Sequence, residues 1–357
     1  MCITSGTTHL GAIMSEYNRK LPAYTKLFRH RDGVLPNMLV FGYAFVGYGA
    51  GWWLVTRDAW LANAVGVVLL AHAMIIAAYL IHECAHNTLF ANNANNARLG
   101  EVLLWLTGAC YGTYEGLRHK HFRHHVDRAD VVAFNFRKYL QQYPWLLRVL
   151  QALEWAYIPA VDLVMHWLVP LMPFVLPTRR EQRARVVTVL LIRGALFVSV
   201  GLYAPTALLC YAISYMVMLH VLRFMDAFQH TYDLFETLEQ ERGPEARQFD
   251  AEFEATHTYS NMHSTKYPLL NLFTLNFGYH NAHHEKPNQP WHRLPALHAN
   301  LFGDTLPQVI PFRHQIACYH RYRVQRMVHE DAVDFDVVGN RGATFVGVDG
   351  VSFLTGH

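Results

Sequence analysis

Long runs of apolar residues constrain the fold of this chain more than any other feature. The first run covers residues 34–55 and the second covers residues 59–81, with few polar side chains in either. At 1.5 Å of rise per residue, each run forms a helix about as long as the roughly 30 Å hydrocarbon core of a bilayer. Only residues 56–58 separate the two runs, so we predict a membrane hairpin.

A third apolar block extends over residues 186–222 and predicts a second hairpin. As one helix it would be roughly 55 Å long, nearly twice the thickness of the membrane core. Gly201 and Pro205 offer a break, because both residue types weaken a helix interior. We therefore expect two spans, about 186–203 and 204–222, which return the chain to the side of the membrane from which it started.

Basic residues precede both predicted hairpins and set the expected orientation. Lysine and arginine accumulate on the cytoplasmic side of membrane proteins, so this side is predicted to face the cytoplasm. The residues are Arg19, Lys20, Lys26, Arg29 and Arg31 before the first hairpin and Arg179, Arg180, Arg183 and Arg185 before the second. We expect a multi-pass integral membrane protein, in the inner membrane if it is bacterial, with no signal peptide.

Two further apolar stretches, residues 99–114 and 144–176, are shorter or more polar, and we expect them to be interfacial or partly re-entrant. If only one of them crossed the membrane, the histidine motifs described next would fall on opposite faces. The predicted fold is an all-α integral membrane protein with four transmembrane helices in two hairpins, interfacial helices and a cytosolic helical cap. The expected divisions are an N-terminal cytosolic segment (1–33), a membrane domain (34–225), the cap (226–320) and a C-terminal tail (321–357).

Nine of the 23 histidines stand in or near short motifs at predicted membrane boundaries. An HxxxH motif directly after the second span is followed by two HxxHH motifs, and one further histidine lies just after the fourth span. Residues at i, i+3 and i+4 share one face of a helix, so the rings of each motif can approach a common ligand. The residues are His82 and His86; His121, His124 and His125; His280, His283 and His284; and His230.

This clustering predicts two metal ions. A single HxxxH motif more often holds structural histidines, but many clustered imidazoles repel when protonated and lose hydration when buried. They also exceed what one ion binds, because zinc takes four ligands and iron at most six. The five cysteines are scattered without a CxxC pair, so they supply no zinc-ribbon or iron–sulfur site. Nitrogen-rich coordination without thiolates favours iron over copper or zinc where the chemistry is oxidative.

The chain resembles the membrane fatty-acid desaturase superfamily in these motifs, in their order around the two hairpins, and in the run NFGYHNAHHE at residues 276–285. The resemblance covers about residues 35–300 and implies a di-iron centre held by the nine histidines named above. Related stearoyl desaturases have an asparagine four residues before the isolated histidine, where it contacts one iron through water. This chain has Asp226 there, so we place Asp226 at the catalytic centre with an altered charge beside that iron.

The resemblance also implies the reaction, which is O2-dependent oxidation of an unactivated C–H bond in a fatty acid or fatty acyl chain. No haem or flavin fingerprint is found, so the electrons are expected from a partner such as a ferredoxin, or cytochrome b5 with its reductase. Desaturation is the commonest outcome in the superfamily. Oxidative decarboxylation of a free fatty acid to a terminal alkene, and hydroxylation, remain open on the same site.

Other function classes fit less well. His82-Glu83-Cys84-Ala85-His86 also matches the HExxH motif of zinc proteases, but one zinc ion would leave about six clustered histidines without a role. A non-catalytic metal carrier would not need two HxxHH motifs at the membrane surface. With a formal charge of +3 and no basic, aromatic-interleaved patch, no nucleic-acid partner is expected.

Three further sets of residues have alternative interpretations. His119 lies outside the second HxxHH motif, and we expect it to support the ligands or to be structural. Asp127 and Asp130 either accept hydrogen bonds from imidazoles or lie on a solvated face. Arg193 is costly in lipid, so we expect it to pair within the protein or with an acidic head group.

Overall fold

The structure is a computed structural model that describes residues 27–354 apart from 233, 241–248, 304–305 and 329–336. The first three of the basic residues expected before the first hairpin, Arg19, Lys20 and Lys26, lie outside the described residues. The described residues are mostly helical, and four of their helices are long and apolar enough to cross a membrane. This confirms the predicted fold class.

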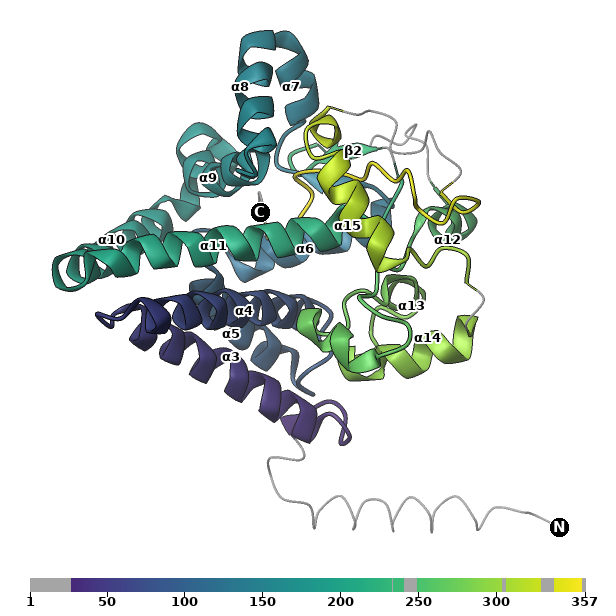
Figure 1. The fold of residues 1–357 in the computed structure, drawn as a ribbon, viewed down its shortest axis with the longest axis horizontal. Coiled ribbons are helices and arrows are strands. Elements are labelled where there is room, and N and C mark those ends of the chain that lie inside the picture. Colours follow the sequence, from purple (N-terminus) through teal and green to yellow (C-terminus); the bar gives the residue numbers. More distant parts are fainter. Residues whose placement is uncertain (1–26, 233, 241–248, 304–305, 329–336, 355–357) are drawn as a thin grey trace.

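The four long helices form the two predicted hairpins. α3 (Val34–Val55) and α4 (Trp60–Ala85) make the first, and α10 (Arg183–Tyr203) and α11 (Pro205–Asp226) make the second. The turns of both hairpins lie at one end of the molecule, and the helices of the cap gather at the other (Figure 1). The polar ends of α4 and α11 are thereby brought to the cap.

α4 is the central helix of the membrane domain and packs against α3, α11 and α5 (Asn93–Thr107). Two glycines allow the close approach of α3 and α4, because a Cβ at Gly51 or Gly66 would lie 3.0 Å from a backbone nitrogen of the facing helix. Small residues serve this role in membrane helices, where packing rather than hydrophobic burial drives association. α10 instead presents side chains such as Leu191 and Leu202 outward, as expected for a helix that contacts lipid.

Two amphipathic helices, α8 (Pro144–Trp155) and α9 (Ala160–Val175), meet at an angle of 114°. A sharp bend of this kind is compatible with the predicted interfacial or re-entrant arrangement of residues 144–176. The short 3₁₀ helix η1 (Pro177–Gln182) then leads into α10.

The short elements of the predicted cap (226–320) are joined by others from residues 114–142 of the predicted membrane domain and 325–327 of the predicted tail. α6 carries the second histidine motif and α13 carries the third, while β1 and β2 form a two-stranded parallel ladder in which Asp130 is opposite Phe235. The sequence analysis did not predict this ladder. The elements are α6 (Tyr114–Asp127), β1 (Asp130–Val132), α7 (Phe136–Gln142), β2 (Phe235–Thr237), α12 (Ala251–His257), η2 (Pro268–Thr274), α13 (His280–Glu285), η3 (Trp291–Arg293), α14 (Leu294–Phe302), α15 (Phe312–Arg321) and η4 (Gln325–Met327).

The C-terminal segment, defined here as residues 337–354, folds back into the interior of the protein. Phe345 and Leu354 are fully buried. Asp349 forms a bidentate ion pair with Arg223 of α11, at 2.5 and 2.7 Å, and the backbone carbonyl of Ser352 accepts a hydrogen bond from Lys120 Nζ at 2.7 Å. The segment thereby joins α11 to α6 beside the histidines.

Candidate metal centre

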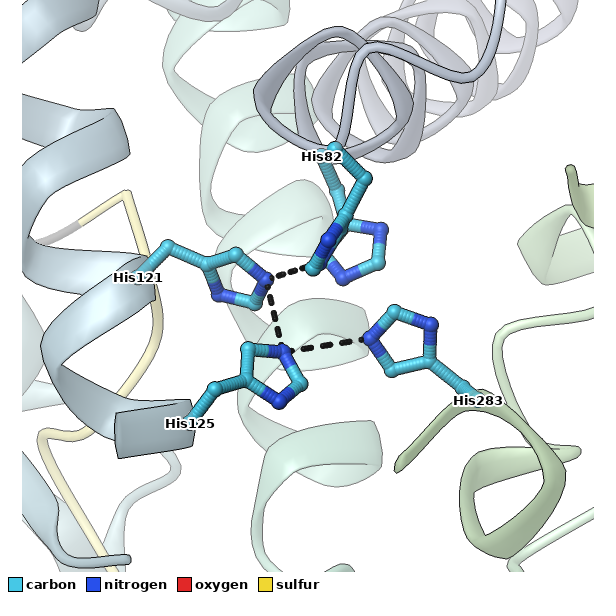
Figure 2. A group of neighbouring side chains, drawn as sticks. His82, His121, His125 and His283 are labelled. Carbon is cyan, nitrogen blue, oxygen red and sulfur yellow. Dashed lines mark hydrogen bonds between the residues drawn. The ribbon is translucent and has the colours of Figure 1, made fainter. Parts of the chain in front are cut away.

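The nine predicted histidines lie together where the cap meets α4 and α11. α4 carries His82 near its end and is followed directly by His86. Thr113 caps the N-terminus of α6, its side chain accepting a hydrogen bond from the backbone N–H of Gly116 at 3.0 Å, and α6 presents its histidines to the same space. Side chains from α4, α6 and α13 converge on a common centre in Figure 2.

The first histidine group consists of His82, His86, His121, His125 and His283, and their ligand atoms all lie within 4.8 Å of one another. The Nε2 atom of His121 is 2.6 Å from that of His86 and 3.2 Å from that of His125. His125 Nε2 is in turn 3.3 Å from His283 Nε2 (Figure 2). The nitrogen atoms of these rings therefore surround one small volume.

The second histidine group consists of His124, His230, His280 and His284, whose ligand atoms lie within the same distance of one another. His230 Nε2 is 3.0 Å from His124 Nε2 and 2.7 Å from His280 Nε2. The two groups are adjacent, because the ring centroids of His125 and His284 are only 4.4 Å apart.

Each HxxHH motif is divided between the two groups. In the second motif, the i, i+4 pair His121 and His125 joins the first group, and His124 joins the second. In the third motif, the i, i+4 pair His280 and His284 joins the second group. We expected the three rings of each motif to share one ligand. The structure separates them because adjacent positions on a helix diverge by about 100°, whereas i and i+4 nearly coincide.

The imidazoles outside the membrane spans are held in their neutral form. Burial lowers the pKa of His125 and His283 well below the ordinary value, and neighbouring imidazoles lower it further. Burial likewise lowers the pKa of His124 to about 4. A neutral imidazole is the form that binds metals, so the site favours ligation at neutral pH.

Several rings are fixed by a hydrogen bond at the nitrogen that faces away from the group. His284 Nδ1 donates to Glu254 Oε1 at 2.8 Å, and His124 Nδ1 donates to the backbone carbonyl of Ala129 at 2.9 Å. Arg128 holds the same carboxylate, with its Nε 2.7 Å from Glu254 Oε2. Such bonds select the tautomer whose Nε2 is available to a metal. Because Glu254 meets His284 through Nδ1, we interpret it as a support for that ring rather than as a ligand.

The donor set fits metal ions better than it fits hydrogen bonding. A neutral imidazole carries one proton on its two nitrogens, so the rings of His124 and His284, whose Nδ1 atoms donate elsewhere, have no proton on Nε2. Nε2 of His82 and Nε2 of His284 are buried without any hydrogen-bond partner. Buried polar atoms rarely remain unpaired in native proteins, and a cation bound among the nitrogens would pair them all.

Asp226 lies in the wall of a cavity of about 40 Å³ beside both groups. His121, His124, His230 and His280 line the same cavity, which has room for one or a few water-sized molecules. The structure therefore places Asp226 next to the histidines, and its catalytic role stays a prediction.

Two residues of this region carried no signal in the sequence. Glu254 belongs to the seven-residue α12, which has no recognisable motif. Phe353, from the C-terminal segment, lines the cavity and packs its ring 5.9 Å from the ring of His82 and 6.1 Å from that of His121. Apolar rings at this position help to exclude water.

The remaining candidates have other contacts. Glu83 accepts hydrogen bonds from the Thr88 hydroxyl at 2.5 Å and from the backbone N–H of Trp291 at 3.1 Å. Its Oε2 thus ties α4 to the cap, while its Oε1 lies 3.8 Å from Nδ1 of His82 in the first group. His119 is exposed on α6, and Asp127 pairs with Arg123 at 2.7 Å.

Known proteins provide an independent comparison. The family model described as fatty acid desaturase matches residues 58–316. The sphingolipid delta(4)-desaturase of Candida albicans (strain SC5314) is 53% identical over 45 residues, and that of Komagataella phaffii (strain GS115) is 50% identical over 44 residues. Each alignment covers 12% of this chain and 12% of the relative's own length.

Proposed function

Because the chain belongs to the fatty acid desaturase family, we propose that it is a membrane-bound di-iron oxidoreductase that uses O2 to desaturate a fatty acid or fatty acyl chain. The family match supports oxidation of a lipid chain, and the four long apolar helices support a membrane setting. The observation that carries the proposal is the convergence of nine imidazoles in two adjacent groups.

Each histidine group would hold one iron ion. The first offers five nitrogen donors and the second offers four, so neither set exceeds the six ligands that iron accepts. The number of donors also argues against a single zinc site, which would be complete with four.

When bound, the two irons would supply the capacity to reduce O2 with two external electrons and to break an unactivated C–H bond. The residues of the chain position that centre and protect it. Glu254 and the carbonyl of Ala129 orient His284 and His124. Phe277 and Phe353 place apolar rings in the cavity wall, which limits access of water to reacting atoms.

The active site would face the cytoplasm and receive electrons from a soluble or membrane-attached partner. The N-terminus of α10 and the C-terminus of α11 lie at the same end of their hairpin, so the basic residues at and just before the start of α10 are on the side of the histidine groups. Positive charge on that side supports a cytoplasmic orientation. A ferredoxin, or cytochrome b5 with its reductase, is the expected class of donor.

Specific observations favour two of the possible reactions. Desaturation comes first, because both relatives reported above are desaturases by name. Oxidative decarboxylation of a free fatty acid to a terminal alkene comes second, because Asp226 stands where related desaturases have an asparagine and lines the cavity beside the histidines. Hydroxylation would use the same centre, but no residue of the cavity favours it.

Product analysis tests the proposal. Purified protein is incubated with O2, a reductase system and fatty acids of several lengths, both free and as thioesters, and mass spectrometry distinguishes internal alkene, terminal alkene and alcohol. We expect O2-dependent internal alkene from wild type and from His119→Ala, which alters an exposed histidine of α6, and none from His121→Ala on the same helix. Equal activity of His121→Ala and wild type would refute the proposed role of the histidine groups.

A further inference from the structure

Arg193 lies at the midpoint of α10, about 15 Å from either end of the helix at 1.5 Å per residue. This position corresponds to the centre of a membrane span. A charged side chain at that depth is costly unless it finds a partner, and such residues commonly mark functional sites in membrane proteins.

The partners of Arg193 among the described residues are neutral, and they include the rings of Tyr111 and Phe197 at 5.7 and 5.1 Å from its guanidinium. Its Nη2 donates to the hydroxyl of Tyr211 at 2.9 Å, and its Nη1 contacts Cys110 Sγ at 3.4 Å. Its Nε is buried without a hydrogen-bond partner. Among the described residues, no carboxylate forms a salt bridge with it.

The buried arginine near the C-terminal end of α11 is treated differently. Arg223 of α11 pairs with Asp349 at 2.5 Å and with Glu154 at 2.7 Å. The fold therefore supplies carboxylates of its own chain to neutralise the buried guanidinium of Arg223. Arg193, without one, has capacity for an anion from outside the chain.

Arg193 stands between two apolar cavities of about 370 and 510 Å³. Both are lined by Arg193, Phe197 and Tyr211, so the guanidinium is the charged group that they share. Cavities that bind small ligands have volumes of about 300–1,000 Å³, are mostly apolar and contain a few polar groups that fix the ligand's orientation. The Arg193 site has this composition.

We propose that Arg193 and Tyr211 bind the carboxylate of a single-chain free fatty acid whose hydrocarbon tail occupies these cavities. A planar guanidinium matches a carboxylate through paired, charge-assisted hydrogen bonds. The depth of Arg193 excludes other lipid anions: phospholipid head groups stay at the interface, and the polar carrier of a thioester cannot enter the hydrocarbon core. A single-chain acid can reach the site through lipid as the neutral carboxylic acid, and the positive charge of Arg193 then favours loss of its proton to water.

The site adjoins the histidine groups through the C-terminal segment. Leu354 lines the smaller Arg193 cavity, and the preceding residue, Phe353, lines the cavity beside the histidines. Consecutive residues thus separate the two spaces. That the bound acid is also the substrate rests on the proposed function, whereas binding of the acid does not.

Binding of radiolabelled palmitic acid to the protein in lipid nanodiscs, corrected for empty nanodiscs, tests the site. We expect saturable binding that unlabelled palmitic acid displaces about 10–100-fold better than methyl palmitate, which corresponds to the loss of a charged hydrogen-bond partner. Arg193→Met is expected to weaken binding to a similar extent, while Arg193→Lys, which keeps the charge but not the paired geometry, should bind with intermediate affinity. Arg148→Met, at an exposed arginine of α8, serves as the matched control and should bind like wild type.

Displacement by methyl palmitate as effective as by the acid would overturn the site, and this comparison needs no variant to fold. Wild-type affinity in an Arg193→Met protein with a native elution profile would overturn it as well. A different result would refute the proposed function. If iron-loaded protein bound palmitic acid but formed no oxidised product from any substrate, the oxidation would be refuted and the Arg193 binding site would still stand.

Discussion

Removal of the Glu254 carboxylate is expected to weaken one of the two metal sites selectively. Glu254 accepts a hydrogen bond from His284 Nδ1 at 2.8 Å, and the side chain of His284 is only 4% exposed. Glu254→Ala would therefore leave a buried N–H unpaired and the ring free to rotate. His284 belongs to the second histidine group, so the loss should fall on that group.

The expected magnitude follows from two independent estimates. An unsatisfied buried donor costs about 1–3 kcal/mol. Loss of a residue that supports a metal-bound histidine weakens metal affinity about 10–100-fold, which corresponds to about 1.4–2.7 kcal/mol. Because the two ranges agree, we expect the iron of the second group to bind roughly 10–100-fold more weakly in Glu254→Ala.

Iron titration against a competing chelator measures this effect. Two controls isolate the contact with His284. Glu252→Ala alters an exposed glutamate of the same helix, and Arg128→Met removes the ion pair of Glu254 while leaving its bond to His284 intact. Glu252→Ala should retain iron like wild type, and Arg128→Met, which loosens the carboxylate without removing it, should weaken the second iron less than Glu254→Ala does. If Glu254→Ala bound both irons as tightly as Glu252→Ala, the assignment of Glu254 as the support of His284 would be wrong.

Three further predictions follow from the structure. Asp226→Asn should keep its iron, because Asp226 lies outside both histidine groups, but it should change the ratio of products seen by mass spectrometry. An unchanged product ratio at an unchanged rate would show that Asp226 has no role in the reaction. Asp349→Asn should destabilise the protein by about 3 kcal/mol in thermal unfolding, because it disrupts a buried ion pair with Arg223, and a shift below about 0.5 kcal/mol would contradict this. Metal-free protein should lose stability as the pH falls from 6.5 towards 4. Burial lowers the pKa of His124 in the folded protein to about 4, whereas this histidine takes up a proton near pH 6.5 in the unfolded chain. A free energy of unfolding that does not change in that pH range would refute the buried, neutral state.

Local sequence signals predicted the membrane helices and the histidine motifs well. The length of an apolar run and the i, i+4 spacing depend only on neighbouring residues, so α4 and the pair His82 and His86 could be recognised without tertiary information. The break near Pro205 was also recognisable, because proline begins α11 as its first residue.

The partition of the histidines could not be read from spacing. Whether His124 joins His121 or His230 depends on how α6 is rotated between α4, the end of α11 and α13, and this rotation is set by tertiary packing. The pairing of Glu254 with His284 likewise joins two short helices that are far apart in the sequence.

The burial of the C-terminal segment is the largest structural feature that could not be predicted from the sequence. Residues 345–354 show neither helical nor strand periodicity, so the sequence analysis treated the region only as a tail. Its burial depends on long-range contacts, chiefly the ion pair of Asp349 with Arg223 and the hydrogen bond between Lys120 and Ser352. Only the folded chain shows that Phe353 lines the cavity beside the histidines.

The metal content of the purified protein tests the central claim most directly. Elemental analysis of protein purified in detergent should find about two irons per chain and little zinc, since two groups with five and four nitrogen donors are present. The same analysis of His121→Ala should show less iron, and His119→Ala should match wild type. A single zinc ion per chain without iron would contradict the di-iron assignment.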